Sequence, residues 1–229
     1  MEIELRGTVL SDEDAEVMRY FGWRDNCCPA DVTDALRTMP EGERLTVVLN
    51  SGGGDLFAGK DLFFALKKAG AACRVTTMSA SAATVAMMGC GEILAHESSL
   101  FCIHDPSVFS SGGTAEELRK TAQELDTLKD SIISAYIGRV KRSRDEIWEL
   151  MRQDRWMTAR EALEIGLIDS ITDGEGEQDG GGQGVKVLNA IGGCFPTDEM
   201  RKRYRDEKQR ERENRIACAK AYAEILNKF

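Results

Sequence analysis

The stretch LTVVLNSGGGDLFAGKDLFFALKKA, residues 45–69, decides the expected fold. It begins with an apolar, β-branched run over 45–49, which is typical of a buried strand. A glycine-rich turn follows at 50–54, and residues 56–69 then show the periodicity of an amphipathic helix. A strand joined to a helix in this way is the unit from which parallel sheets with crossover helices are built.

The same alternation continues along the chain and predicts an α/β protein. Before the opening stretch we expect a strand over 3–10 and a short helix over 31–39. After it, the pattern predicts strands near 73–77, 93–95, 100–103 and 167–169, and helices over 82–88, 114–140, 144–151 and 159–165. The last helix has a capping-box signature at Thr158 and Glu161 and is closed by Gly166.

The sequence also predicts three regions. The main domain covers residues 1–172, and a Gly- and acid-rich linker covers 173–197. A highly charged helix is expected over 198–229, either as a solvated helix or as a partner-binding tail.

Composition excludes several classes of protein. The net charge of −9 and the pI near 5.0 argue against nucleic-acid binding. No run is long enough to cross a bilayer and no signal peptide is evident, so we expect a cytoplasmic protein without membrane contact. Seven cysteines without a C-x-x-C pair, and two histidines, favour buried free thiols over a zinc site or a catalytic cysteine. We expect no metal and no cofactor.

Two small-residue segments are candidates for binding a negative charge and for supplying a nucleophile. The turn at 50–54 can direct backbone N–H groups at an anion or a developing oxyanion, although, taken alone, the segment favours a plain tight turn. It lacks the lysine of a P-loop. The segment MSASAATVAMM, residues 78–88, places Ser81 where a strand becomes a helix, similar to a nucleophile elbow. Close helix packing is the alternative function of this segment, and Ser79 is the competing nucleophile.

A histidine is the third candidate. His104 leaves an apolar strand just before Pro106, where it can face a cleft, whereas His96 has the context of an exposed turn. A serine nucleophile needs such a base, and the base needs an orienting carboxylate. Asp105, Asp154 and Asp169 are the candidates, and spacing alone does not choose among them.

Taken together, these segments resemble the ClpP family of self-compartmentalising serine peptidases. The family's N-S-P-G-G turn corresponds to residues 50–54, and its A-S segment to 80–83. Its I-H-x-P segment corresponds to 103–106. Its D-R-aromatic-(L/M)-(S/T)-A-x-E-A segment, followed by G-L-(I/V)-D, corresponds to 154–162 and 166–169. The resemblance runs in the family's order from about Ile3 to Thr172.

The resemblance implies a fold and a set of roles. The fold would be a ClpP/crotonase-like spiral of β-β-α units, in which the 114–140 helix is the handle between rings of a homo-oligomer. Ser81 would be the nucleophile, His104 the general base and Asp154 the acid. The N–H groups of Gly54 and Ala82 would form the oxyanion hole. An extended substrate would pair near Gly53, Ser107 and the 108–113 segment.

Departures from the family suggest a branch. Gly52 replaces the family's proline, residues 21–29 form an insertion, and the linker and charged helix are extra. We expect the N-terminal pore-forming stretch of ATPase-dependent members to be missing. The combination is most similar to head maturation proteases of phages and prophages, which implies an ATP-independent endopeptidase acting on capsid or scaffold proteins. The alternatives are a ClpP-type subunit fed by an ATPase, an inert ring or scaffold subunit, and a crotonase-like acyl-CoA enzyme.

Overall fold

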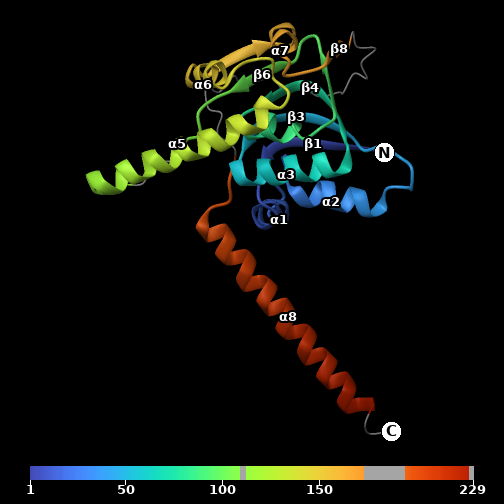
Figure 1. Cartoon of the computed structure of the whole chain (residues 1–229). Helices are drawn as coiled ribbons and strands as arrows, with labels where there is room; N and C mark the ends of the chain where they lie inside the picture. Colours follow the sequence, from blue (N-terminus) through green and yellow to red (C-terminus); the bar gives the residue numbers. More distant parts are fainter. Residues whose placement is uncertain (109–111, 173–193, 227–229) are drawn as a thin grey trace.

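A computed structural model describes residues 1–108, 112–172 and 194–226 (Figure 1). Strands and helices alternate through most of this length, as the periodicity predicts. The elements are β1 (Glu2–Val9), α1 (Asp12–Tyr20), β2 (Asn26–Cys27), α2 (Pro29–Thr38), β3 (Thr46–Gly54), α3 (Leu56–Ala69), β4 (Ala72–Ala80), α4 (Ala82–Met87), β5 (Glu92–His96), β6 (Leu100–Ile103), α5 (Ala115–Ile137), α6 (Arg144–Arg152), β7 (Arg155–Thr158), α7 (Ala159–Ile165), β8 (Ser170–Thr172) and α8 (Asp198–Leu226).

Within the described residues the strands form one sheet of eight. The main path runs β2-β1-β3-β4-β5-β8, and every pair along it is parallel. The far end of β4 leaves β5 and pairs instead with β6, also in parallel, and β6 pairs with β7 in the antiparallel sense. This mixed α/β architecture, with a mainly parallel sheet and crossover helices, confirms the predicted ClpP-like fold class.

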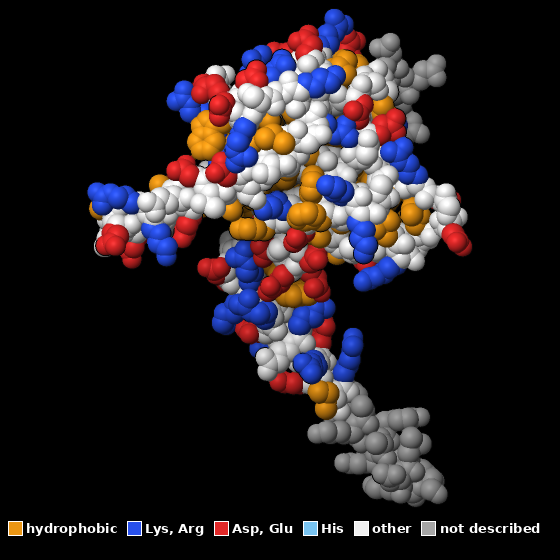
Figure 2. Space-filling model, viewed as in Figure 1, with side chains coloured by type: hydrophobic (Ala, Val, Ile, Leu, Met, Phe, Trp, Pro, Cys, Tyr) orange, Lys and Arg blue, Asp and Glu red, His pale blue; other side chains and the backbone are white. Residues whose placement is uncertain are grey.

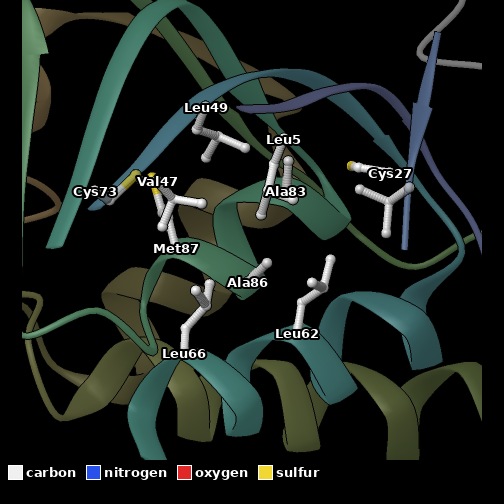
Figure 3. Close-up of a pocket in the computed structure, with 11 residues that line it drawn as sticks. Leu5, Cys27, Val47, Leu49, Leu62, Leu66, Cys73, Ala83, Ala86 and Met87 are labelled. Carbon is white, nitrogen blue, oxygen red and sulfur yellow. The ribbon is translucent and has the colours of Figure 1, made fainter. Parts of the chain in front are cut away.

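The main core lies between the sheet and helices α3 and α4. Figure 3 shows Leu62 and Leu66 of α3 and Met87 of α4 pointing at strand side chains such as Val47 and Cys73. The small gap among them is lined entirely by apolar side chains, so it is a packing defect of the core rather than a candidate site. Helix α3 approaches the end of α4 so closely that a Cβ on Gly89 would lie 2.1 Å from the carbonyl oxygen of Phe63.

Helix α5 is only half covered. It projects from the body in Figure 1, and most side chains of its first three turns are exposed. Its second half is anchored by four buried side chains: Lys129, Ile132, Ile133 and Tyr136. The predicted long helix is therefore confirmed, with an anchored half behind α4 and α6 and an unpartnered half in this protomer.

Three parts of the fold differ from the sequence expectations. The strand expected over 167–169 is wrong, because Leu167 and Ile168 are buried in the connection and β8 begins only at Ser170. The segment before α7, for which no strand was expected, contains β7, which is too short for a clear alternation. Helix α1 and the short β2 were not expected. Charged residues dominate the segment 12–20, and the segment 21–29 was interpreted as an insertion.

Helix α8 begins on the body of the protein and then leaves it. Arg201 donates to both carboxylate oxygens of Asp14 in α1 at 2.8 and 3.0 Å. Tyr204 is buried against Tyr20, with ring centroids 5.3 Å apart. Beyond Tyr204 the described side chains are mostly charged and exposed, as Figure 2 shows along the projecting helix. Residues 173–193 of the predicted 173–197 linker lie outside the described residues.

We expect the Arg201–Asp14 pair to hold the start of α8 on α1. Replacing Arg201 by methionine (Arg201→Met) removes both charge-assisted hydrogen bonds to Asp14, from side chains that are 28% and 19% exposed, at a cost of about 1–2 kcal/mol. It also removes a bond to the fully exposed Asp198 within α8. Hydrogen exchange of the 198–204 amides should then accelerate roughly tenfold. The matched control is Lys202→Met, at a side chain that is 74% exposed. Equal exchange in the two variants would contradict the docking role.

Candidate active site

The candidate residues gather at one edge of the sheet. The glycines at 52–54 end β3, Ser81 follows β4 and His104 follows β6. Because β3, β4 and β6 pair in parallel, their carboxyl ends meet at the same edge. Asp154 directly precedes β7, and the antiparallel pair Ile103↔Arg155 places Asp154 across from His104. The fold thus brings together four segments that are separated by up to about a hundred residues in sequence.

Ser81 has a strained backbone. Its φ of 56° and ψ of −127° lie in a region that non-glycine residues rarely adopt, and such strain costs on the order of 1–3 kcal/mol. The residue stands at the N-cap of α4, yet its side chain makes no capping hydrogen bond. A serine in this place normally caps the helix, so Ser81 Oγ is left available for another partner.

The backbone of Gly53 packs directly against Ser81. A Cβ at Gly53 would lie 2.5 Å from Cβ of Ser81 and 2.7 Å from the carbonyl oxygen of Ala80, and its φ is +96°. The Gly53 N–H is already donated to Ser51 Oγ at 3.1 Å, and Ser51 Oγ donates to the Gly7 carbonyl at 2.6 Å. The buried Ser51, which the sequence did not single out, therefore fixes the turn.

Two backbone amides are candidates for an oxyanion hole. The Ala82 amide belongs to the first turn of α4, where N–H groups have no acceptor within the helix. The Gly54 amide is the next one after Gly53, whose own N–H is used. Gly54 has a φ of +151°, and a Cβ there would lie 2.2 Å from the Val9 carbonyl oxygen. Glycine is therefore required at 54 by the close approach of β1.

A buried hydrogen-bond chain supports Ser81 from behind. Thr84 Oγ1 donates to the Ser81 carbonyl at 2.6 Å and lies 2.7 Å from Tyr136 Oη. Because the single hydroxyl proton of Thr84 goes to the carbonyl, Tyr136 must be the donor to Thr84. Tyr136 is 1% exposed, and burial raises the pKa of its phenol. Neither residue was predicted, since no motif marks them.

His104 has a defined tautomer. Its Nδ1 lies 2.7 Å from the backbone carbonyl oxygen of Asp105, which can only accept, so Nδ1 carries the proton. The neutral ring then offers a lone pair at Nε2, the nitrogen that a general base uses. Among the described residues this buried Nε2 has no hydrogen-bond partner, so Ser81 Oγ does not reach it in this conformation.

The three candidate acids occupy different places. Asp154 lies nearest the base, with Oδ1 4.0 Å from His104 Nδ1, too long for a hydrogen bond. Its side chain is 73% exposed and its φ is +47°. Asp105 forms an ion pair with Lys129 at 2.6 Å instead. Asp169 binds Arg139 and the Ile93 amide in the connection before β8, a structural role.

The remaining candidates are less suited to nucleophilic attack. Ser79 is 0% exposed inside β4, so a substrate does not reach it. Cys102, whose carbonyl accepts the Ser81 N–H at 2.9 Å, is buried, and desolvation raises the pKa of its thiol to about 11. It stays a neutral thiol near pH 7. His96 Nδ1 accepts the Ser98 N–H within a turn.

The expected substrate-pairing segment is described only in part. Ser107 and Val108 are exposed beyond His104, and residues 109–111 of the 108–113 segment lie outside the described residues. No group of three or more His, Cys, Asp or Glu side chains within the described residues is arranged to hold a metal ion. The arrangement is suited to acyl transfer: a hydroxyl on a strained turn, a histidine with a free Nε2, and amides at the turn.

Gly53→Ala tests the close packing of Gly53 against Ser81. The added methyl overlaps backbone and Ser81 Cβ, and it needs a left-handed φ, so we expect fluorophosphonate labelling of Ser81 to slow by roughly 100-fold or more. Gly52→Ala is the matched control. Its nearest atom would be Met78 Sδ at 4.0 Å, so labelling should stay within about twofold of the parent rate. Similar rates in both variants would contradict this description of the turn.

Thr84→Val tests the hydrogen-bond chain. Valine keeps the shape but leaves the buried Tyr136 hydroxyl without its acceptor and removes the side-chain hydrogen bond to the Ser81 carbonyl. The free energy of unfolding in urea should therefore fall by about 1–3 kcal/mol. Adding Tyr136→Phe removes the orphaned hydroxyl, so the double variant should lose less than the sum of the two single variants. Strict additivity would contradict the chain.

Comparison with known proteins gives a consistent result. The family described as "Clp protease" matches residues 33–175. The chain is similar to an "ATP-dependent Clp protease proteolytic subunit" of Bacteroides fragilis, with 30% identity over 59% of this chain and 67% of the relative. It is also similar to an "ATP-dependent Clp protease proteolytic subunit 1" of Chlamydia pneumoniae, with 33% identity over 74% of this chain and 94% of the relative. The corresponding protein of Chlamydia muridarum is 32% identical over 59% and 73%.

The described helices include none that is both long and apolar enough to span a membrane. The parallel sheet, the glycine turn against Ser81 and the match over more than half of the sequence agree with one another. The chain belongs to the Clp protease family.

Proposed function

We propose that this chain is a serine endopeptidase that works through an acyl-enzyme. Ser81 Oγ attacks the peptide carbonyl, and His104 Nε2 takes the hydroxyl proton and returns it to the leaving amine. Water then cleaves the ester with the same base. The amides of Gly54 and Ala82 bind the oxyanion, and Asp154 stabilises the imidazolium that forms. Gly53, Ser107 and their neighbours pair with an extended substrate.

The observation that carries this proposal is the backbone of Ser81. Ser81 has a strained φ at a strand-to-helix junction, and its hydroxyl does not cap the helix. Such strain lowers the stability of the fold, so its presence here favours a functional role for Ser81. The free Nε2 of His104 at the same sheet edge adds a base. An approach of Ser81 Oγ to Nε2 would complete the pair, and such bonds are often loose before substrate binds.

The substrate and the energy source are finer parts of the proposal. The resemblance to head maturation proteases and the added α8 favour capsid or scaffold proteins as substrates, cut without ATP by a homo-oligomeric ring. The alternative is a subunit fed by an unfoldase ATPase, which the names of the similar Bacteroides and Chlamydia proteins favour. Degradation of unfolded casein by the chain alone, without nucleotide, is expected in the first case. A strict need for an unfoldase and ATP supports the second.

The test of the chemistry is covalent labelling. The full chain is treated with a fluorophosphonate, and the modified residue is mapped by mass spectrometry. We expect the label on Ser81, its loss in Ser81→Ala and its near-loss in His104→Gln, by about 100-fold or more. Ser79→Ala should label normally, since Ser79 is buried. An unlabelled, well-folded protein that also fails to cut casein would indicate the inert subunit instead.

A further inference from the structure

Lys129 is a buried cation on the anchored half of α5. It is 3% exposed, and lysine is rarely buried to this degree unless its charge is paired. The amine lies 2.6 Å from Asp105 Oδ1 and 3.9 Å from the centre of the Trp148 ring of α6. The ion pair and the cation–π contact together hold the charge in place. The chemistry proposed above does not use this cluster.

The cluster lies directly behind the base. Asp105, the residue that Lys129 binds, also supplies the backbone carbonyl that accepts the Nδ1–H of His104 at 2.7 Å. The ion pair therefore restrains the side chain of the same residue whose carbonyl holds the ring. Glu149 and Arg152 of α6 are the other charged groups near the pair, and they bind each other at 3.0 Å.

The carboxylate expected to orient His104 does not do so in this structure. Asp154 Oδ1 is 4.0 Å from Nδ1 and its side chain is 73% exposed, whereas the Asp105 carbonyl makes a short hydrogen bond. A bond from Nδ1–H to either acceptor selects the same tautomer and leaves Nε2 as the base. The Asp105 carbonyl is therefore the group that determines the orientation and tautomer of the His104 ring in this structure.

We propose that Lys129 is a positioning residue for the peptidase reaction, acting through Asp105. Its ion pair aligns the Asp105 carbonyl, which holds the His104 ring as the Nδ1–H tautomer with Nε2 free to accept the serine proton. The inference rests on the proposed function for its catalytic meaning. The tautomer itself is measurable whether or not the protein cleaves peptides.

The first measurement is the tautomer. The chain has two histidines, so His96→Gln leaves His104 as the single imidazole, and ¹⁵N-histidine labelling with solid-state NMR of the sedimented protein reports both ring nitrogens. The spectrum is taken where the ring is neutral. We expect a protonated Nδ1 and an unprotonated Nε2. In Lys129→Met, a second signal set from the Nε2–H tautomer should appear.

The second measurement is the rate of Ser81 labelling by a fluorophosphonate across pH 6–9. Lys129→Met should slow labelling by about tenfold or more, because less of the ring is in the useful tautomer. Lys129→Arg keeps the charge and should recover much of the rate. The matched control is Lys120→Met on the same helix, at a side chain that is 77% exposed, which should change the rate by less than about twofold.

Asp105→Asn keeps the carbonyl but removes the ion pair, and it carries the test if Lys129→Met does not fold. It should give the same mixed tautomer, and Asp105→Asn with Lys129→Met should be no slower than the worse single variant. An unchanged tautomer in the folded variants, or slowing no greater than in Lys120→Met, would overturn the inference. If wild-type Ser81 does not label at all, the proposed function fails while the tautomer spectra still decide the role of Lys129.

Discussion

The site depends on keeping Ser81 in a backbone conformation that the chain would otherwise leave. The φ of 56° costs on the order of 1–3 kcal/mol, and it persists because several contacts require it together. The Ser81 N–H extends the β4–β6 ladder to the Cys102 carbonyl, Thr84 binds the Ser81 carbonyl, and Gly53 closes the remaining side. A single residue is therefore fixed by a strand, a helix and a turn. A hydroxyl that does not cap the helix is the consequence of that restraint.

Helix α5 connects the two halves of the site. Lys129 and Tyr136 are seven residues apart, so they lie on one face of the helix about 10 Å from each other. Tyr136 is hydrogen-bonded to Thr84, which binds the carbonyl of the candidate nucleophile Ser81. Lys129 forms an ion pair with Asp105, whose carbonyl binds the candidate base His104. The anchored half of α5 is thus a rigid support for the site, and its exposed half projects beyond it (Figure 1).

Sequence reasoning reached the parts of this molecule that depend on local pattern. The bounds expected for 56–69, 100–103 and 159–165 agree with α3, β6 and α7. Hydrophobic periodicity and capping depend on residues that are close together in sequence, so these elements can be predicted locally. Ser81 and His104 could be favoured because each follows an apolar strand. Asp154 came only from family resemblance, since its approach to His104 arises from the β6–β7 register. No sequence motif marks Lys129, Tyr136 and Thr84 as parts of the site. Their residue types are common, and Lys129 and Tyr136 contact partners that lie far away in sequence.

Two helices outside the family match are connected to the site through β1. Helices α1 and α8 lie outside the region of the family match, and Arg201 and Tyr204 join them into one unit. The segment that leads into α8 also binds the body, where the Cys194 amide donates to Thr8 Oγ1 at 3.1 Å. Thr8 and Val9 pair with Gly53 and Gly54 in the sheet, and Val9 makes the contact that requires glycine at 54. The segment that leads into α8 therefore contacts the strand that backs the candidate oxyanion turn.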